Sequence, residues 1–140
     1  LSANRPKLML VNFKDPDQAG HSGSFELYLA GIEHADACAF KLWSWIQSQE
    51  EFRDRTDVFF TSDHGRHSDG VSSGFSNHGD SCEGCRKLWL LAMGPDFRKG
   101  FVSDARRQQI DIPATAAAIL GFSIPGSDGR VLTEILETGQ

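Results

Sequence analysis

Short apolar runs punctuate this chain, and each ends in a polar, glycine-containing segment. The runs are "KLMLVNF" at 7–13, "TDVFFTS" at 56–62 and "RKLWLLAMGP" at 86–95. Continuous apolar runs of this length are typical of strands that are covered on both faces. The pattern therefore predicts three strands, with a last apolar segment, "GRVLTEIL", at 129–136.

A different period appears between the first and second runs. From Phe25 to Ile46, apolar residues recur at spacings of three and four, which predicts one long amphipathic helix. Ser24 has the side chain of an N-cap for that helix. A shorter helix is predicted within 101–122, ended by Gly121.

Strands that alternate with helices predict an α/β fold, with a mostly parallel sheet flanked by helices. At 140 residues, the chain has the length of one ordinary domain with a single core. Ten Phe and three Trp argue against disorder.

The charge and hydropathy of the chain exclude two classes of partner. A formal net charge of −5, with scattered cationic residues, offers no nucleic-acid-binding surface. No apolar stretch approaches the ~20 residues that a membrane span needs. The sequence does not indicate an oligomeric state.

Candidate metal ligands follow the predicted strands. Asp17 and His21 come after the first strand, Asp63 and His64 come directly after the second, and His78 precedes the third. In open α/β sheets, ligands bind beyond the carboxyl ends of the strands. We therefore expect these side chains to converge there.

The spacing of these residues suits a metal site. A helical turn would place Asp17 and His21 on one side, and Gly20 would let a backbone approach closely. Asp63 and His64 reach one ion only if the chain turns, which Gly65 permits. Carboxylate oxygen together with imidazole nitrogen suits Zn²⁺, Mn²⁺ or Fe.

The ordered set of motifs resembles one enzyme family. "NFKDPDQAGHSG" precedes a long helix, "TSDHG" and "NHGD" follow, and "DIPATAAAILGFSIPGSDGRVLTEIL" ends the match. Together they resemble the C-terminal half of the alkaline phosphatase superfamily, which includes phosphodiesterases, cofactor-independent phosphoglycerate mutases, phosphopentomutases and arylsulfatases.

The resemblance implies a site for two divalent metal ions, zinc or manganese. Asp17, His21 and His78 match the ligands of one metal, and Asp63 and His64 match two ligands of the other. The resemblance also implies a Ser or Thr nucleophile from an N-terminal half that has no counterpart in residues 1–140.

We therefore expect this chain to be the C-terminal portion of an alkaline phosphatase-like catalytic domain. The implied activity of the full-length protein is hydrolysis or transfer of phosphate or sulfate esters, with a small ester as substrate. Alone, the chain is expected to lack a catalytic nucleophile, to show no appreciable turnover, and to hold metal partially or not at all. An inactive member of the superfamily is an alternative.

The cysteines of the long polar segment leave several possibilities open. Cys82 and Cys85 can form a disulfide, half of a zinc site completed by His67 or His78, a redox pair, or two unconnected thiols. With His78 as a ligand, the chain would instead be a non-catalytic zinc module. A disulfide favours an exported, periplasmic protein, and free thiols favour a cytoplasmic one. His67, Asp80 and Arg86 are candidates to support the metal ligands from behind, and Arg66 or Arg86 could pair with an anionic substrate.

Overall fold

A computed structural model describes residues 4–137 of the chain. The chain folds as two compact units. The first unit contains the residues up to Gln49 together with His64–Leu88, and the second contains Glu50–Asp63 and the residues from Trp89 onward. Among the described residues, no helix has both the length and the apolar character needed to cross a bilayer.

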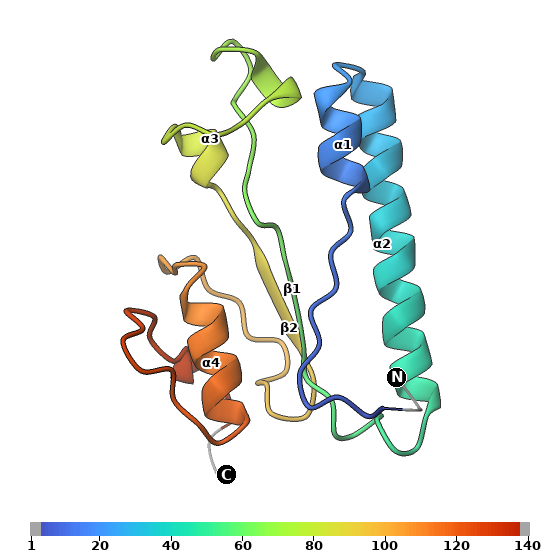
Figure 1. The fold of residues 1–140 in the computed structure, drawn as a ribbon, viewed down its shortest axis with the longest axis vertical. Coiled ribbons are helices and arrows are strands. Elements are labelled where there is room, and N and C mark those ends of the chain that lie inside the picture. Colours follow the sequence, from blue (N-terminus) through green and yellow to red (C-terminus); the bar gives the residue numbers. More distant parts are fainter. Residues whose placement is uncertain (1–3, 138–140) are drawn as a thin grey trace. The chain divides into compact units, whose positions relative to one another are not determined.

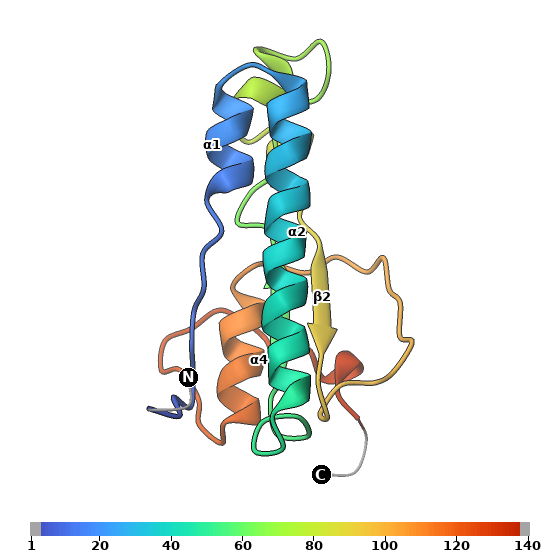
Figure 2. The ribbon, with the colours of Figure 1, turned by 90° about the vertical axis from the view of Figure 1, so that its right-hand side faces the viewer.

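Two helices dominate the first unit. Helix α1 (Asp15–His21) and helix α2 (Phe25–Ser48) lie side by side in both ribbon views (Figures 1 and 2). The predicted N-cap is confirmed, because the Ser24 hydroxyl accepts a hydrogen bond from the Leu27 N–H at 3.3 Å. Gly31 allows the close packing, since a Cβ there would lie 3.0 Å from the Asp15 carbonyl oxygen.

The long polar segment, His64–Leu88, completes the first unit. It contains a 3₁₀ turn, η1 (Gly74–Ser76), and a single helical turn, α3 (Glu83–Arg86). Hydrogen bonds tie its two ends together: the Gly65 N–H donates to the Cys85 carbonyl at 2.8 Å, and the His67 N–H donates to the Asn77 carbonyl at 3.3 Å. The segment is therefore folded, although it contains few apolar residues.

The second unit contains the sheet. Strands β1 (Val58–Thr61) and β2 (Leu90–Met93) pair antiparallel, with Val58 opposite Met93. Helix α4 (Asp111–Ile119) and the 3₁₀ turn η2 (Thr133–Ile135) follow along the chain. The buried side chains of this unit include Phe97, Ala117 and Leu132.

Two expectations about the sheet need correction. The run at 7–13 forms no strand, and Leu10 within it is 95% exposed. An apolar run becomes a strand only when a neighbouring strand takes its backbone hydrogen bonds. Among the described residues, β1 and β2 pair with each other, and neither pairs with the run at 7–13.

The predicted parallel pairing is not found among the described residues either. A parallel pair needs a crossover connection, usually a helix, whereas an antiparallel pair does not. The long helix precedes β1, and only η1 and α3 lie between β1 and β2. The order of elements around β1 and β2 thus fits the antiparallel pairing that is observed.

A buried polar network organises the C-terminal part of the second unit. The Asp111 side chain, 3% exposed, accepts hydrogen bonds from the N–H groups of Gln108 at 2.9 Å and Arg130 at 3.0 Å. The Thr115 hydroxyl accepts from the Leu132 N–H at 2.9 Å. These bonds hold the segment after α4 against the helix.

The pKa of Asp111 reports this network. Burial disfavours its ionised form, but the Gln108 and Arg130 N–H groups and the Arg130 guanidinium outweigh burial and lower the pKa. A carboxylate with a lowered pKa stabilises the fold above the pKa of the unfolded chain, and that stabilisation is lost as pH falls through the folded value.

We therefore predict that Asp111→Asn destabilises the second unit at pH 7 by roughly 1.5–3 kcal/mol, the usual value of hydrogen bonds to a charged group. Urea denaturation at pH 7 and at a pH below the folded pKa of Asp111 measures the difference, which should shrink in acid. Asp128→Asn, an exposed change in the same unit, is the control. A cost equal to that of the control at pH 7 would contradict the prediction.

Asp57 lies in the opposite situation at the end of the sheet. Its Oδ1 accepts the Asp96 N–H at 3.2 Å, and a Cβ on Gly94 would lie 2.1 Å from this oxygen. Burial under the Gly94 turn, with the nearby Asp96 carboxylate adding repulsion, raises the pKa of Asp57 from 3.8 to about 6.

Since folded Asp57 keeps its proton to higher pH than the unfolded chain does, stability should fall as pH rises from about 4 to about 6. Asp57→Asn keeps the acceptor oxygen and removes the charge. We expect it to stabilise the second unit at pH 7 by about 1–2 kcal/mol, with no gain below pH 4. Denaturant titrations across this pH range measure the effect, and a gain that is independent of pH would refute it.

Candidate metal centre

Helix α1 places two of the predicted ligands together. Pro16 starts this helix, and its regular turn brings Asp17 and His21 onto one side, four residues apart. The distance from Asp17 Oδ1 to His21 Nε2 is 3.4 Å. Both side chains are about 40% exposed, so a small ligand can reach them.

The polar segment brings two more imidazoles to the same carboxylate. His78 Nε2 lies 3.2 Å from Asp17 Oδ1 and 3.1 Å from His21 Nε2. His64 Nε2 lies 3.7 Å from Asp17 Oδ1, and its ring stacks on that of His78 at 3.6 Å. We call Asp17, His21, His64 and His78 the histidine cluster.

Backbone carbonyls orient two of these imidazoles. The Nδ1 atom of His21 lies 3.1 Å from the Ser76 carbonyl oxygen, and that of His64 lies 3.0 Å from the Gly65 carbonyl oxygen. A carbonyl accepts only an N–H, so both rings present an N–H at Nδ1 to a carbonyl and turn Nε2 toward Asp17. Metal-binding histidines are oriented in this way.

Arg66 holds the carboxylate from the side. Its guanidinium, 8% exposed, forms an ion pair with Asp17 Oδ1 and also donates to the Asp17 carbonyl at 2.8 Å and to the Phe75 carbonyl at 3.1 Å. It lies 5.2 Å from the ring centroid of Tyr28, in cation–π range. Arg66 therefore fixes Asp17 relative to α2 and to the polar segment.

The donor atoms of the histidine cluster fit a divalent cation. Those of Asp17, His64 and His78 all lie within 4.8 Å of one another, close enough to surround one ion. Partial burial and the charges of His64, Arg66 and His21 outweigh the Asp17 carboxylate and lower the pKa of His78, which favours its neutral form. A neutral imidazole is the form that binds metal.

The structure thus brings Asp17, His21 and His78 together, which was expected from their positions next to the predicted strands. It also places His64 beside them, although His64 was assigned with Asp63 to a second metal. Asp63 ends its segment in the second unit, and its part in a metal site stays a prediction.

The residues expected to support these ligands lie elsewhere. His67 and Asp80 gather with Cys82 and Cys85 in a separate group of donor atoms. Cys82 and Cys85 are free thiols in this structure and not a disulfide. Arg86 is exposed at the end of α3. The Asp80 carboxylate, which accepts from the Cys82 thiol, raises the pKa of Cys82 to about 11.

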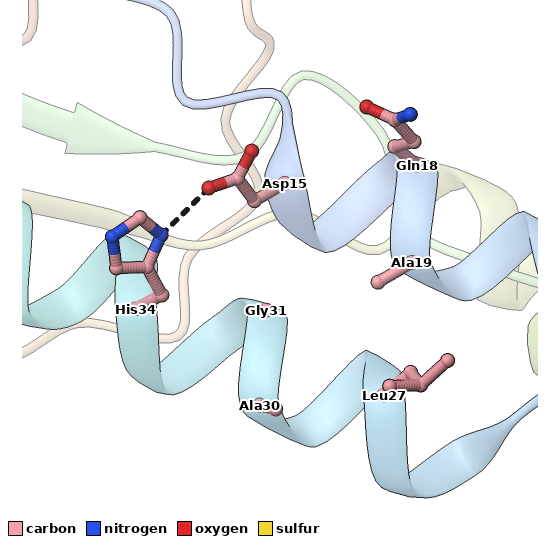
Figure 3. Close-up of a pocket in the computed structure, with 7 residues that line it drawn as sticks. All are labelled: Asp15, Gln18, Ala19, Leu27, Ala30, Gly31 and His34. Carbon is pink, nitrogen blue, oxygen red and sulfur yellow. Dashed lines mark hydrogen bonds and ion pairs between the residues drawn. The ribbon is translucent and has the colours of Figure 1, made fainter.

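A groove between α1 and α2 lies apart from these clusters (Figure 3). Apolar Leu27, Ala30 and Ala19 line it, and the His34 ring pairs with the Asp15 carboxylate at 2.6 Å at one end. None of the groove-lining residues belongs to the histidine cluster. The mostly apolar lining gives the groove little to hold a charged ligand.

The role of one residue of the site was not predicted from the sequence. Arg66 was expected to be a surface or substrate-binding arginine, whereas its side chain is buried against Asp17 and Tyr28. The available signal was its position two residues after His64. In extended backbone, residues i and i+2 face the same way, so Arg66 shares the side of His64.

Comparison with known proteins gives matches in one family. The Metalloenzyme superfamily matches residues 1–124. A 2,3-bisphosphoglycerate-independent phosphoglycerate mutase of Legionella pneumophila (strain Corby) is 25% identical over 128 residues, which cover 91% of this chain and 23% of that protein. The mutase of Clostridium tetani (strain Massachusetts / E88) is 32% identical over 65 residues, covering 46% of this chain and 12% of that protein.

The chain therefore spans less than a quarter of the length of these relatives. No solved structure matches it. The family match covers 124 of 140 residues, including the whole histidine cluster. On this evidence the chain belongs to the Metalloenzyme superfamily, the alkaline phosphatase-like family that its motifs resemble.

Proposed function

We propose that this chain supplies metal ligands to a metal-dependent phosphoryl-transfer site. The observation that carries the proposal is the histidine cluster, in which one carboxylate and three imidazoles from distant parts of the sequence converge. Phosphoryl transfer is preferred to sulfuryl transfer because the relatives named above are phosphoglycerate mutases.

The complete reaction needs groups beyond these residues. The motif resemblance calls for a Ser or Thr nucleophile, and the chain matches only 23% of the length of the Legionella mutase. We propose that the nucleophile and the remaining ligands of a second metal lie in another part of the full-length protein. Asp63 is the proposed contribution of this chain to that second metal.

Each residue of the cluster has a defined task in this proposal. Asp17, His21 and His78 would hold one divalent cation, zinc or manganese, with His64 at its edge. Such a cation polarises a phosphoryl oxygen and offsets the charge that develops during transfer. The carbonyls of Ser76 and Gly65 keep the proton of their imidazoles on Nδ1 and the lone pair on Nε2. Arg66 keeps the carboxylate in place.

We predict that the chain binds Mn²⁺ or Zn²⁺ through this cluster. In metalloproteins, loss of a residue that supports a metal ligand lowers metal affinity by roughly 10–100-fold. His21→Ala removes a ligand itself, so it should lower the affinity for the metal by at least this factor. The affinity is measured by isothermal titration calorimetry with Mn²⁺. Because thiolates bind Mn²⁺ poorly, the cysteines should not contribute to the signal. Equal Mn²⁺ affinity of His21→Ala and the unchanged chain would refute the proposal.

His34→Ala is the matched control. His34 is also a histidine of the first unit paired with an aspartate, but its side chain is 65% exposed and lies outside the cluster. Its loss should leave Mn²⁺ affinity unchanged.

The Arg66 guanidinium occupies space that is open because Gly20 has no side chain. A Cβ on Gly20 would lie 2.5–2.8 Å from the guanidinium carbon and nitrogens of Arg66. Gly20 is buried within α1, where alanine would otherwise favour the helix by about 1 kcal/mol. Any destabilisation by alanine at this position therefore reports the displacement of Arg66.

We predict that Gly20→Ala lowers the free energy of unfolding of the first unit by about 1–3 kcal/mol, the usual cost of overpacking. In an Arg66→Ala background, the same substitution should cost less or stabilise the helix. Denaturant unfolding of the four chains of this double-mutant cycle gives the coupling energy. Additive effects would show that Gly20 does not make room for Arg66.

A further inference from the structure

The polar segment carries a second group of metal-binding atoms that the phosphoryl-transfer proposal does not use. His67 Nδ1, one Asp80 carboxylate oxygen and the two sulfurs of Cys82 and Cys85 lie within 4.8 Å of one another. We propose that these four residues, which we call the cysteine cluster, bind one structural Zn²⁺ ion.

The distances within the cysteine cluster match a tetrahedral site. His67 Nδ1 lies 3.4 Å from each sulfur and 3.5 Å from Asp80 Oδ2. With bond lengths of about 2.1 Å to nitrogen or oxygen and about 2.3 Å to sulfur, a tetrahedral zinc separates nitrogen from sulfur by about 3.6 Å and nitrogen from oxygen by about 3.4 Å. The three distances from His67 Nδ1 therefore differ from the tetrahedral values by only a few tenths of an ångström.

The chemistry of the donors selects the ion and its role. Two sulfurs, one imidazole nitrogen and one carboxylate oxygen suit zinc, whereas Mg²⁺ and Ca²⁺ prefer all-oxygen sites. Four protein ligands close the tetrahedron and leave no position for substrate, which is the pattern of structural sites. His67 and Cys85 are buried, 8% and 7% exposed, as expected for ligands at the back of such a site.

The backbone around the cysteines is shaped for this purpose. The Cys85 N–H donates to Cys82 Sγ at 3.3 Å across the turn of α3, and the Cys82 N–H donates to Asp80 Oδ1 at 2.9 Å. The first bond helps to stabilise a thiolate, and the second orients the carboxylate.

Two glycines let the His67 segment lie against this turn. A Cβ on Gly84 would lie 2.3 Å from the Arg66 carbonyl oxygen, and a Cβ on Gly65 would lie 2.0 Å from the Gly84 carbonyl oxygen. A side chain at either position would force the two segments apart. Their close approach places His67 opposite both sulfurs.

The consequence for the molecule lies in the order of residues along the segment. Arg66 and His67 are neighbours, and one contacts Asp17 while the other contacts the cysteines. His78 and Asp80 divide in the same way between the two clusters. A zinc ion in the cysteine cluster would therefore fix the segment that carries Arg66 and His78 to the histidine cluster.

The proposal differs from the zinc site that the sequence suggested as an alternative. There, His67 or His78 was the candidate partner of Cys82 and Cys85, and Asp80 was not included. Because His78 lies 3.2 Å from Asp17 Oδ1, it belongs to the histidine cluster, and His67 with Asp80 completes the cysteine cluster. The inference does not rest on the proposed function, so either can fail without the other.

The experiment measures zinc in chains whose histidine cluster has been disabled by Asp17→Asn and His21→Ala. After loading with Zn²⁺ under reducing conditions and desalting, mass spectrometry of the metal content should give one zinc per chain. Adding Cys82→Ser and Cys85→Ser should bring the zinc content close to zero. Cys38→Ser, which changes the free cysteine of α2, is the matched control and should keep the zinc.

A second measurement does not depend on the folding of the serine variants. The chain with intact cysteines, loaded with Co²⁺, should show an intense near-ultraviolet thiolate-to-cobalt charge-transfer band together with the visible bands of a tetrahedral ion. The proposal is overturned if this band is missing, if the serine variants keep their zinc, or if Cys82 and Cys85 form a disulfide and exclude the metal.

Discussion

The first unit depends on the interactions of a single carboxylate. The Oδ1 atom of Asp17 contacts the Arg66 guanidinium and lies near the imidazoles of His21, His64 and His78. These partners come from α1 and from two stretches of the polar segment, one at His64 and Arg66 and the other at His78. The segment contains few apolar residues. Charge and hydrogen bonding therefore hold the segment to α1, and Phe75 packs on the rings of Phe25 and Tyr28 of α2.

The same segment has to satisfy two clusters at once. His64 and Arg66 contact Asp17, whereas His67 contacts the cysteines, so one stretch of chain reaches both groups of donor atoms. The second contact region, at His78 and Asp80, turns through Gly79 with a positive φ of 115°. A shift of one residue in either stretch would place the wrong side chain at each cluster, so the two sites constrain each other's register.

Features that depend on residues close together in the sequence could be predicted, whereas features that depend on contacts between distant residues could not. The long helix, its Ser24 cap and the end of α4 at Gly121 follow from local patterns, and the structure confirms them. Strand pairing depends on neighbours, so the apolar run at 7–13 was wrongly predicted as a strand, and the predicted parallel sheet is not confirmed by the one antiparallel pair that the described residues form. In the site, Asp17, His21 and His78 were found from their residue types and placement. The burial of Arg66 and the choice of His67, rather than His78, beside the cysteines depend on contacts across the folded segment, which spacing alone does not encode.

Two aspartates of the chain show why a convergence of polar groups can indicate either structure or function. Asp111 is surrounded by donors, namely the N–H groups of Gln108 and Arg130, and its charge is satisfied by the fold itself. Asp17 has Arg66 as a donor, but it also faces the Nε2 atoms of His21 and His64, whose Nδ1 atoms face backbone carbonyls. Lone pairs of nitrogen and oxygen that point at one another repel unless a proton or a cation lies between them. Asp111 therefore has a complete structural role, whereas the geometry around Asp17 requires positive charge among these atoms, which a bound metal ion would supply in the metal-site proposal.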